Sequence, residues 1–358
     1  MKQNIDSLLN SFIGNVKFPF DFFQAANYMG IKKAGDLNYA LSWLEANPAV
    51  LSVGNNAFAS RIGMFTDQVF SILPSRYEIN NNILIVGHRC IPFGNPDVLP
   101  CDYKFLFKNN AIPHKIIEMQ TNDLFDYYYL HGEEFVPQYL SLDPANKGFD
   151  MADCDYELPG KMKVTVFDMA DFYKKFSFKS GDRLKVRLEN WMLGIFSIDV
   201  QKDTRETPFE INESEEARER WFELFEKQLL QSFDLFGVAG SIDEQIAFAY
   251  ILAGTELFSD LSGSVEEYIK KTNKIEITEF GVETRLWRAG EAISVMNLRL
   301  DNDLDDSDIE RFNGVSKIFL SIGVPLTEIF LDSFIYDSLY KKEQNCDLIL
   351  KRIMPENI

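Results

Sequence analysis

The chain has 358 residues, and its 55 Asp and Glu outnumber its 36 Lys and Arg to give a formal net charge of −19. Because 46% of the residues are hydrophobic, the chain can bury a large core, which excludes an intrinsically disordered protein. The length predicts two or three domains, at roughly 100–200 residues each, and the acidity disfavours non-specific binding to nucleic acid or to an anionic membrane.

The N-terminal residues and the cysteines predict a cytoplasmic protein. Polar residues interrupt the N-terminal stretch where a signal peptide would need about 7–15 apolar residues. No run of the sequence approaches the roughly 18 apolar residues of a membrane span, so no membrane contact is expected. The four cysteines are widely spaced, which is typical of free thiols in a reducing compartment.

Charge is distributed unevenly along the chain. Residues 206–358 carry a net charge of −16, whereas the first 205 residues carry only −3. The polar segment 202–216 contains a proline and has no apolar periodicity, which is typical of a domain boundary. We therefore predict a multi-domain α+β protein with an N-terminal unit at 1–75, a β-rich domain at 76–205 and an acidic, mainly helical domain at 206–358.

In the N-terminal unit, apolar residues at helical spacing predict helices over 5–14, 19–30 and 36–47, and a β-hairpin over 50–60. Three helices followed by a hairpin resemble a winged helix, a fold that usually binds DNA through its third helix. The third predicted helix has no Arg or Lys, although phosphate contacts need cations. We therefore expect this winged-helix-like unit to contact protein, with DNA binding or a purely structural role as alternatives.

From residue 76 onward the apolar pattern changes to a period of two, which predicts antiparallel hairpins over 76–88, 103–118 and 183–201. In the last hairpin, placing Leu188 opposite Phe196 makes one face wholly apolar and the other polar. A slip of one residue would mix the two faces, so the register is predicted as well. The expected result is an antiparallel sheet or a small, partly open barrel.

The polar face of this last hairpin and the segment before it hold the main concentration of basic residues in an acidic sequence. The six basic side chains are Lys174, Lys175, Lys179, Arg183, Lys185 and Arg187. They point to an acidic partner, including the C-terminal domain of the same chain, or to phosphate or nucleic acid bound by residues 1–205. The alternative is a solvated strand face whose lysines deter aggregation.

Two of the three histidines lie near two cysteines, at His88, Cys90, Cys101 and His114. A tetrahedral zinc site uses four such ligands, but the Cys-x-x-Cys spacing of zinc ribbons is missing. A Cys–His nucleophile pair would need spatial contact. A zinc site or an enzyme centred on these residues is therefore kept as an alternative to ordinary buried cysteines, and the Pro- and Gly-rich segment 87–94 is a loop where a site could lie.

The C-terminal domain is predicted to contain helices over 221–229, 246–257 and 265–271, and two strands over 275–280 and 284–287. A further run begins like a calcium loop, with Asp301, Asp303 and Asp305. Asp306 and Phe312 then occupy the positions that require Gly and Glu. A capping box that starts a helix at Ser307 explains the run better than calcium does.

The sequence has no Gly-x-Ser-x-Gly elbow, no phosphate-binding loop and no His-Glu-x-x-His helix. We therefore expect no enzyme and no cofactor, and instead an intracellular interaction or regulatory protein that contacts a protein partner through the acidic helical domain and the winged-helix-like unit. Two alternatives remain. One is a nucleic-acid-associated regulator that binds through the winged helix and the strand of Arg183, Lys185 and Arg187, and the other is an enzyme or metal site at His88, Cys90, Cys101 and His114.

Overall fold

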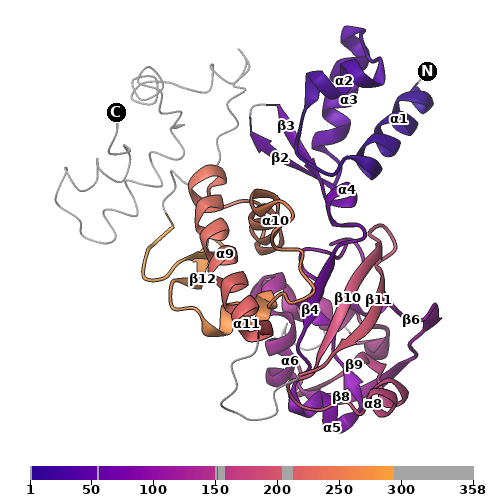
Figure 1. The fold of residues 1–358 in the computed structure, drawn as a ribbon, viewed down its shortest axis with the longest axis vertical. Helices are drawn as coiled ribbons and strands as arrows, with labels where there is room; N and C mark the ends of the chain where they lie inside the picture. The colour runs from indigo at the N-terminus through magenta and orange to yellow at the C-terminus, as the bar shows by residue number, and fades with distance from the viewer. Residues whose placement is uncertain (1, 55, 150, 152–157, 204–212, 294–358) are drawn as a thin grey trace, which may run out of the picture.

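The computed structural model describes residues 2–54, 56–149, 151, 158–203 and 213–293, and the fold of these residues is α+β (Figure 1). The predicted domain boundary at 202–216 lies largely outside them. The acidic run from Asp301 and the predicted helix after Ser307 lie wholly outside the described residues. No helix within the described ranges is long and apolar enough to cross a membrane.

The N-terminal lobe, residues 2–60, contains the three predicted helices and the predicted hairpin. Its elements are α1 (Lys2–Asn15), β1 (Phe20–Asp21), α2 (Phe22–Met29), α3 (Ala34–Glu45), β2 (Val50–Gly54) and β3 (Ala57–Ser60), with the sheet order β1-β3-β2. Asp21 caps α2 by accepting the backbone N–H of Gln24 at 2.9 Å, and Gly30 ends this helix in the left-handed conformation that glycine adopts without strain. Figure 1 shows the lobe at one end of the long axis of the molecule.

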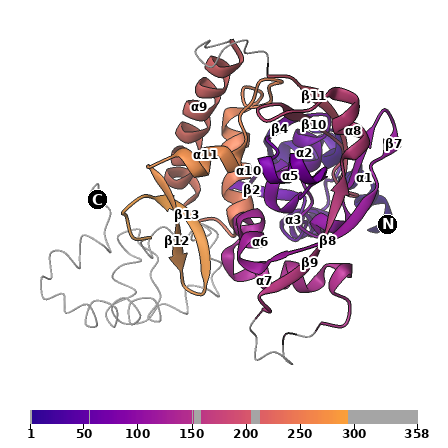
Figure 2. The same ribbon diagram turned by 90° about the horizontal axis from the view of Figure 1, so that it is seen from below.

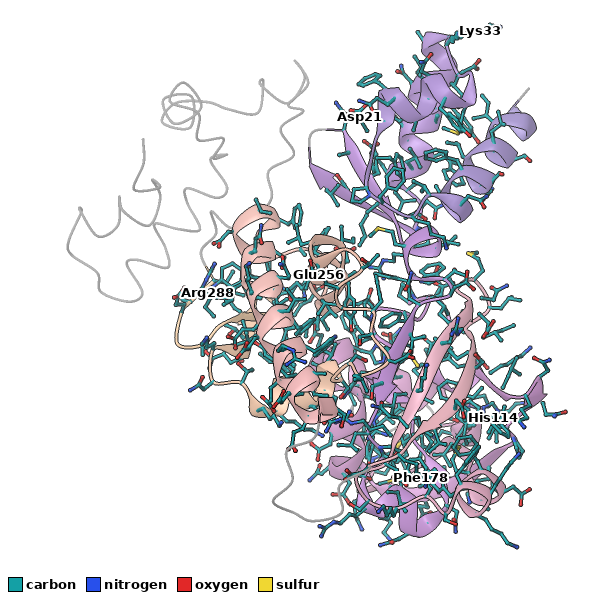
Figure 3. The ribbon with its side chains drawn as sticks, in the orientation of Figure 1. Asp21, Lys33, His114, Phe178, Glu256 and Arg288 are labelled. Carbon is teal, nitrogen blue, oxygen red and sulfur yellow. The ribbon has the colours of Figure 1, made fainter. Side chains whose placement is uncertain are left out.

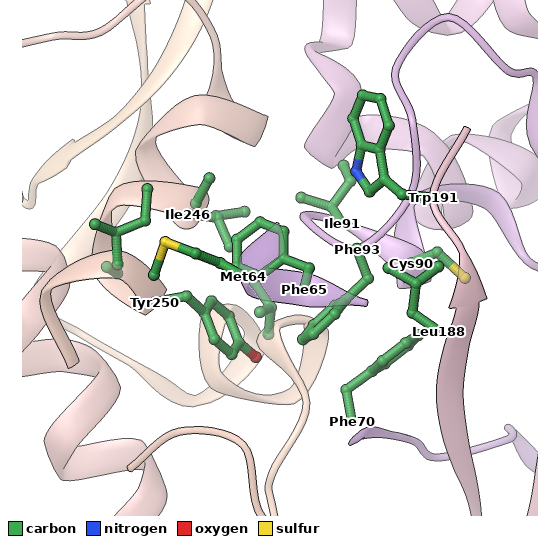
Figure 4. Close-up of a cluster of buried hydrophobic side chains, with 14 of the residues drawn as sticks. Met64, Phe65, Phe70, Cys90, Ile91, Phe93, Leu188, Trp191, Ile246 and Tyr250 are labelled. Carbon is green, nitrogen blue, oxygen red and sulfur yellow. The ribbon is translucent and has the colours of Figure 1, made fainter. Parts of the chain in front are cut away.

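The short helix α4 (Arg61–Phe65) is the neck that joins the lobe to the body, which comprises the described residues from 66 to 293. Gly63 lets α4 pack against the end of α1, because a Cβ at this position would lie 1.9 Å from the carbonyl oxygen of Val16. At the other end of α4, the fully buried ring of Phe65 lies 5.5 Å from the ring of Phe93 and 6.2 Å from that of Tyr250. Figure 4 shows these rings in one cluster, so the neck is held by the core of the body.

The body contains a five-stranded sheet with the order β4-β10-β11-β6-β7. Its strands are β4 (Val69–Ile72), β6 (Lys104–Phe107), β7 (Asn110–Ala111), β10 (Arg183–Asn190) and β11 (Ile195–Gln201). The predicted register of the last hairpin is confirmed, because Leu188 pairs with Phe196 and Val186 with Ile198. Strand β6 runs parallel to β11, so the sheet is not purely antiparallel as expected.

A second sheet has the order β5-β9-β8 and is formed by β5 (Ile83–Leu84), β8 (His114–Gln120) and β9 (Lys161–Asp168). The helices of this region are α5 (Arg76–Asn81), α6 (Thr121–Tyr128), α7 (Val136–Leu142) and α8 (Ala170–Phe176). Short 3-10 turns lie at η1 (Gly87–Cys90), η2 (Pro100–Asp102), η3 (Tyr129–His131), η4 (Glu133–Phe135) and η5 (Pro144–Asn146). None of the sheets in the described part of the chain is closed into a barrel.

Two predicted hairpins of this region need correction. The segment 76–81 is a helix rather than a strand, because Ser75 and Glu78 form a capping box that starts it. In the segment 103–118, β6 and β7 form the expected hairpin, but the chain then crosses to the second sheet, where β8 pairs with β9. A pattern of period two fixes the strand faces but not the partner of each strand, so it could not distinguish these pairings.

The C-terminal part of the body contains α9 (Glu213–Phe236), α10 (Ile242–Ala253), α11 (Val265–Lys271), β12 (Ile275–Phe280) and β13 (Glu283–Arg288). The helices and strands predicted here are confirmed, and β12 pairs with β13 in antiparallel orientation. Figure 2, which views the molecule from below, shows α10 and α11 against the part of the body that carries β4 and α6. One continuous buried cluster includes side chains from all three predicted domains, and a smaller one lies beside β8 and β9.

Candidate functional site

The neck cavity is a pocket of about 410 Å³ where the lobe, the neck and the body meet. It lies within the range of about 300–1,000 Å³ that is usual for small-molecule sites, and such sites favour the junctions between structural units. The residues that line it come from five separate segments of the chain. They are Pro48, Arg61, Gly87, Cys90, Ile91, Gly94, Pro96, Leu99, Tyr103, His131, Phe135, Gln138, Tyr139, Leu142, Ser241, Asp243 and Glu244.

The segment 87–94, which the sequence marks as unusual, forms one wall of the neck cavity. Gly87 has φ of +49°, and a Cβ there would lie 1.8 Å from the carbonyl oxygen of Tyr127. A Cβ on Gly94 would meet the hydroxyl of Tyr103 at 2.1 Å. Position 87 therefore requires glycine, whereas a side chain at position 94 would have to displace the hydroxyl end of Tyr103.

A buried ion pair joins the neck to the body across the cavity. The guanidinium of Arg61 donates to the carboxylate of Asp243, although the two residues are 182 positions apart in the sequence. Asp243 lies in the first turn of α10, which Ser241 caps by accepting the backbone N–H of Glu244 at 3.1 Å. Burial raises the pKa of Asp243 above its ordinary value, and the adjacent Arg61 opposes this effect. The side chain of Arg61 is only 2% exposed, so breaking the pair would leave a buried charge.

Aromatic side chains form another wall. The imidazole of His131 stacks on the ring of Tyr139, with ring centres 4.3 Å apart and 26° between the ring planes. Burial lowers the pKa of His131 to about 4, and Nε2 of this ring has no hydrogen-bond partner in the described part of the protein. His131 is therefore neutral at neutral pH. Tyr103, Phe135 and Tyr139 complete the aromatic lining.

The structure does not bring His88, Cys90, Cys101 and His114 together as a metal site. No group of three or more His, Cys, Asp and Glu side chains within the described ranges is arranged to hold a metal ion. Cys90 lines the neck cavity and Cys101 lies in η2, and burial raises the pKa of both thiols, which disfavours the thiolate needed of a nucleophile. His114 is exposed at the start of β8, on the side of the body away from the lobe (Figure 3).

His88 is buried at 2% exposure, and neither of its ring nitrogens has a hydrogen-bond partner among the described residues. Its ring packs edge-on against Tyr129, with the centres 4.8 Å apart. Desolvation lowers the pKa of His88 to about 3, although the carboxylate of Glu266 acts in the opposite direction. The other charged or titratable groups that act on it are Arg89, His131 and Lys270. Burying an imidazole without hydrogen-bond partners costs free energy of folding. Protonating it in the core costs more, because the charged ring would also be desolvated.

The six predicted basic residues separate into two groups. Arg183 is buried and forms a bidentate ion pair with Glu267 of α11, and Lys185 pairs with Asp260 at 2.5 Å. The acidic C-terminal part of the chain thus neutralises two of the three basic residues on the strand. The other four side chains are exposed, and they are Lys174, Lys175, Lys179 and Arg187. Of these, Lys175 lies over the ring of Phe107 at 4.4 Å.

A buried charge network provides a further link between the two halves of the sequence. Arg89 donates to Glu78 at 2.7 Å and to Glu266 of α11 at 2.8 Å. Glu266 also accepts from Lys270 at 2.6 Å, and these charges lower its pKa to about 2 despite burial. Glu78 in turn accepts the backbone N–H of Ile85. Acidic residues of the C-terminal part therefore form ion pairs with basic residues of the N-terminal part of the same chain.

Sequence reasoning found the 87–94 wall but missed the other residues of the neck cavity. His131, Tyr139, Asp243 and Glu244 belong to segments that carry no recognisable motif, and only the tertiary fold brings them to the same cavity as Arg61. Searches against protein-family models, curated proteins and solved structures found no match.

Proposed function

We propose that this chain is a non-enzymatic regulatory protein whose neck cavity binds a small molecule and whose N-terminal lobe contacts a protein partner. The observation that carries this proposal is the composition of the cavity wall, because Pro48 and Arg61 come from the lobe and neck while all other lining residues come from the body. A ligand that contacts both sides favours one orientation of the lobe over others, by its difference in affinity for those orientations.

The surface proposed for the partner is a second groove, of about 800 Å³, between α1 and α2 of the lobe. Exposed aromatic side chains line it, with Phe18 at 66% and Tyr28 at 84% exposure. Exposed apolar surface bordered by polar groups is typical of protein contacts. The exposed residues of α3 include no Arg or Lys, so a protein partner suits this lobe better than DNA does.

Nucleic acid suits the basic strand less well than the sequence alone indicates. Arg183 and Lys185 would have been the central phosphate contacts of the basic strand, and both are paired with acidic residues of the same chain. Binding through the remaining exposed lysines and Arg187 would be weak and strongly dependent on salt. Titration of the full chain with labelled double-stranded DNA at low salt tests this alternative directly.

A screen of small molecules against the full chain tests the proposal. A ligand at 100 times its Kd raises the free energy of unfolding by about 2.7 kcal/mol, which thermal denaturation detects easily. Compounds that stabilise the chain are then tested on Leu142→Trp, which places a large side chain at the mouth of the cavity. Leu193→Trp is the matched control, because Leu193 is similarly exposed (58% against 52%) and does not line the cavity.

We expect the stabilisation to be lost in Leu142→Trp and retained in Leu193→Trp. Hydrogen exchange of the α4 amides should also slow when a ligand binds, because the ligand ties the neck to the body. The proposal is wrong if no compound stabilises the chain, or if both variants respond like the unmodified protein.

A further inference from the structure

Three charged side chains line the neck cavity, and their net charge is negative. Asp243 and Glu244 are carboxylates of α10, and Arg61 is the only Lys or Arg of the lining. Arg61 is already paired with Asp243, so its charge is compensated within the protein. Glu244 uses Oε2 to accept the backbone N–H of Gly240 at 2.8 Å, and Oε1 makes no hydrogen bond with the described residues. One carboxylate therefore faces the cavity without a cationic partner among the lining residues.

The uncharged part of the lining also suits a cation. Tyr103, Phe135 and Tyr139 provide aromatic rings, whose negative π faces attract ammonium groups. His131 adds no positive charge, because burial keeps its imidazole neutral at neutral pH. Burial likewise raises the pKa of Tyr139, so its phenol stays protonated. The cavity thus combines an unpaired carboxylate with aromatic walls.

One feature of the cavity opposes a cation. The N-terminus of α10 points at it, and a helix dipole is equivalent to roughly half a positive charge at that end. Asp243 is already balanced by Arg61, but the full negative charge of Glu244, in the first turn of the same helix, outweighs this partial charge. The net charge of −19 adds a negative potential around the whole chain, which raises the local concentration of cations.

We propose that the ligand of the neck cavity is an organic cation, a protonated amine attached to a flat or apolar group. The ammonium would lie against Glu244, and the flat group would pack among Tyr103, Phe135 and Tyr139. This inference rests on the proposed function, because it names the class of molecule that would hold the lobe to the body.

Three probes of nearly the same shape test the charge preference on the full chain by calorimetry. They are 2-phenylethylamine, which is a cation at neutral pH, 2-phenylethanol, which is neutral, and 3-phenylpropanoate, which is an anion. We expect the amine to bind about tenfold more tightly than the alcohol and the anion to bind most weakly. One cation–π contact and one partly buried ion pair together account for a difference of this size.

Glu244→Gln is the decisive variant, because the glutamine keeps an acceptor for the backbone N–H of Gly240 and removes only the charge. We expect it to abolish the preference for the amine over the alcohol. Glu256→Gln is the matched control. Glu256 follows α10 at its other end, is exposed and does not line the cavity, so this change alters the net charge equally (Figure 3).

The outcomes separate the two proposals. If the alcohol or the anion binds as tightly as the amine, the cation inference is wrong while the cavity remains a ligand site. If Glu244→Gln and Glu256→Gln weaken amine binding equally, the preference comes from the overall charge of the chain and the inference is also wrong. If the screen finds no ligand of any charge, the proposed function fails and the inference fails with it.

Discussion

The buried histidines should make the protein sensitive to mild acid. Burial lowers the pKa of His88 to about 3 and that of His131 to about 4, whereas an unfolded histidine titrates near 6.5. Because folding lowers these pKa values, the unfolded chain binds protons first as the pH falls. The stability that depends on the neutral rings is therefore complete above about pH 6.5 and is lost progressively below it.

The size of the effect follows from the shift in pKa. Between about pH 7.5 and about pH 5, each ring removes about 2 kcal/mol from the free energy of unfolding, so the two rings together remove about 4 kcal/mol. The raised pKa of Asp243 has the opposite sign and reduces the net slope. The lowered pKa of Glu266 acts below its ordinary value of 4.5, outside this interval. The contribution of His88 is therefore measured more cleanly by comparing variants than from the overall pH dependence of stability.

His88→Phe is the appropriate change, because it keeps a ring against Tyr129 and removes two ring nitrogens that have no partner among the described residues. We expect the loss of stability between about pH 7.5 and about pH 5 to decrease by about 2 kcal/mol in this variant. Urea denaturation monitored by tryptophan fluorescence measures it, since Trp191 and Trp287 are buried. His114→Phe is the control, and its effect should be smaller because His114 is exposed. An unchanged pH dependence in His88→Phe would refute the reasoning.

Three further predictions concern the neck and the charge network. Arg89→Met leaves the fully buried carboxylate of Glu78 without a cationic partner and leaves Glu266 with Lys270 alone, and it should cost about 3–5 kcal/mol. Lys185→Met, whose partner is exposed, should cost about 0–1 kcal/mol; urea denaturation distinguishes the two variants, and equal losses would contradict the role of burial. Phe65→Ala should cost about 3–5 kcal/mol in the same assay, because its fully buried ring joins the neck to the core, and a loss below about 1 kcal/mol would show that the site refills. Gly87→Ala should destabilise the chain more than Gly30→Ala: both glycines have positive φ, but only at Gly87 would the added Cβ collide with backbone, and circular dichroism melting curves decide the order.

Local patterns in the sequence determine much of the secondary structure of this protein. Helices α2 and α11 begin at the polar caps Asp21 and Ser264, and these caps act within three residues of the chain. The register of β10 and β11 follows from the alternation of apolar and polar side chains, because one strand face must be buried. The capping box at Ser75 was equally visible in the sequence, so the helix α5 could have been predicted in place of a strand.

Pairing over long distances in the sequence was decided only by the tertiary structure. The strand pattern could not show that β8 leaves its hairpin to pair with β9, because both partners satisfy the same period of two. The candidate site has the same origin, since Arg61 meets Asp243 across 182 residues and no local motif marks either one. The sequence showed an excess of acid in the C-terminal part, whereas the fold decided that Glu266 and Glu267 pair with Arg89 and Arg183. A buried charge must find an opposite charge in space, wherever in the chain that partner lies.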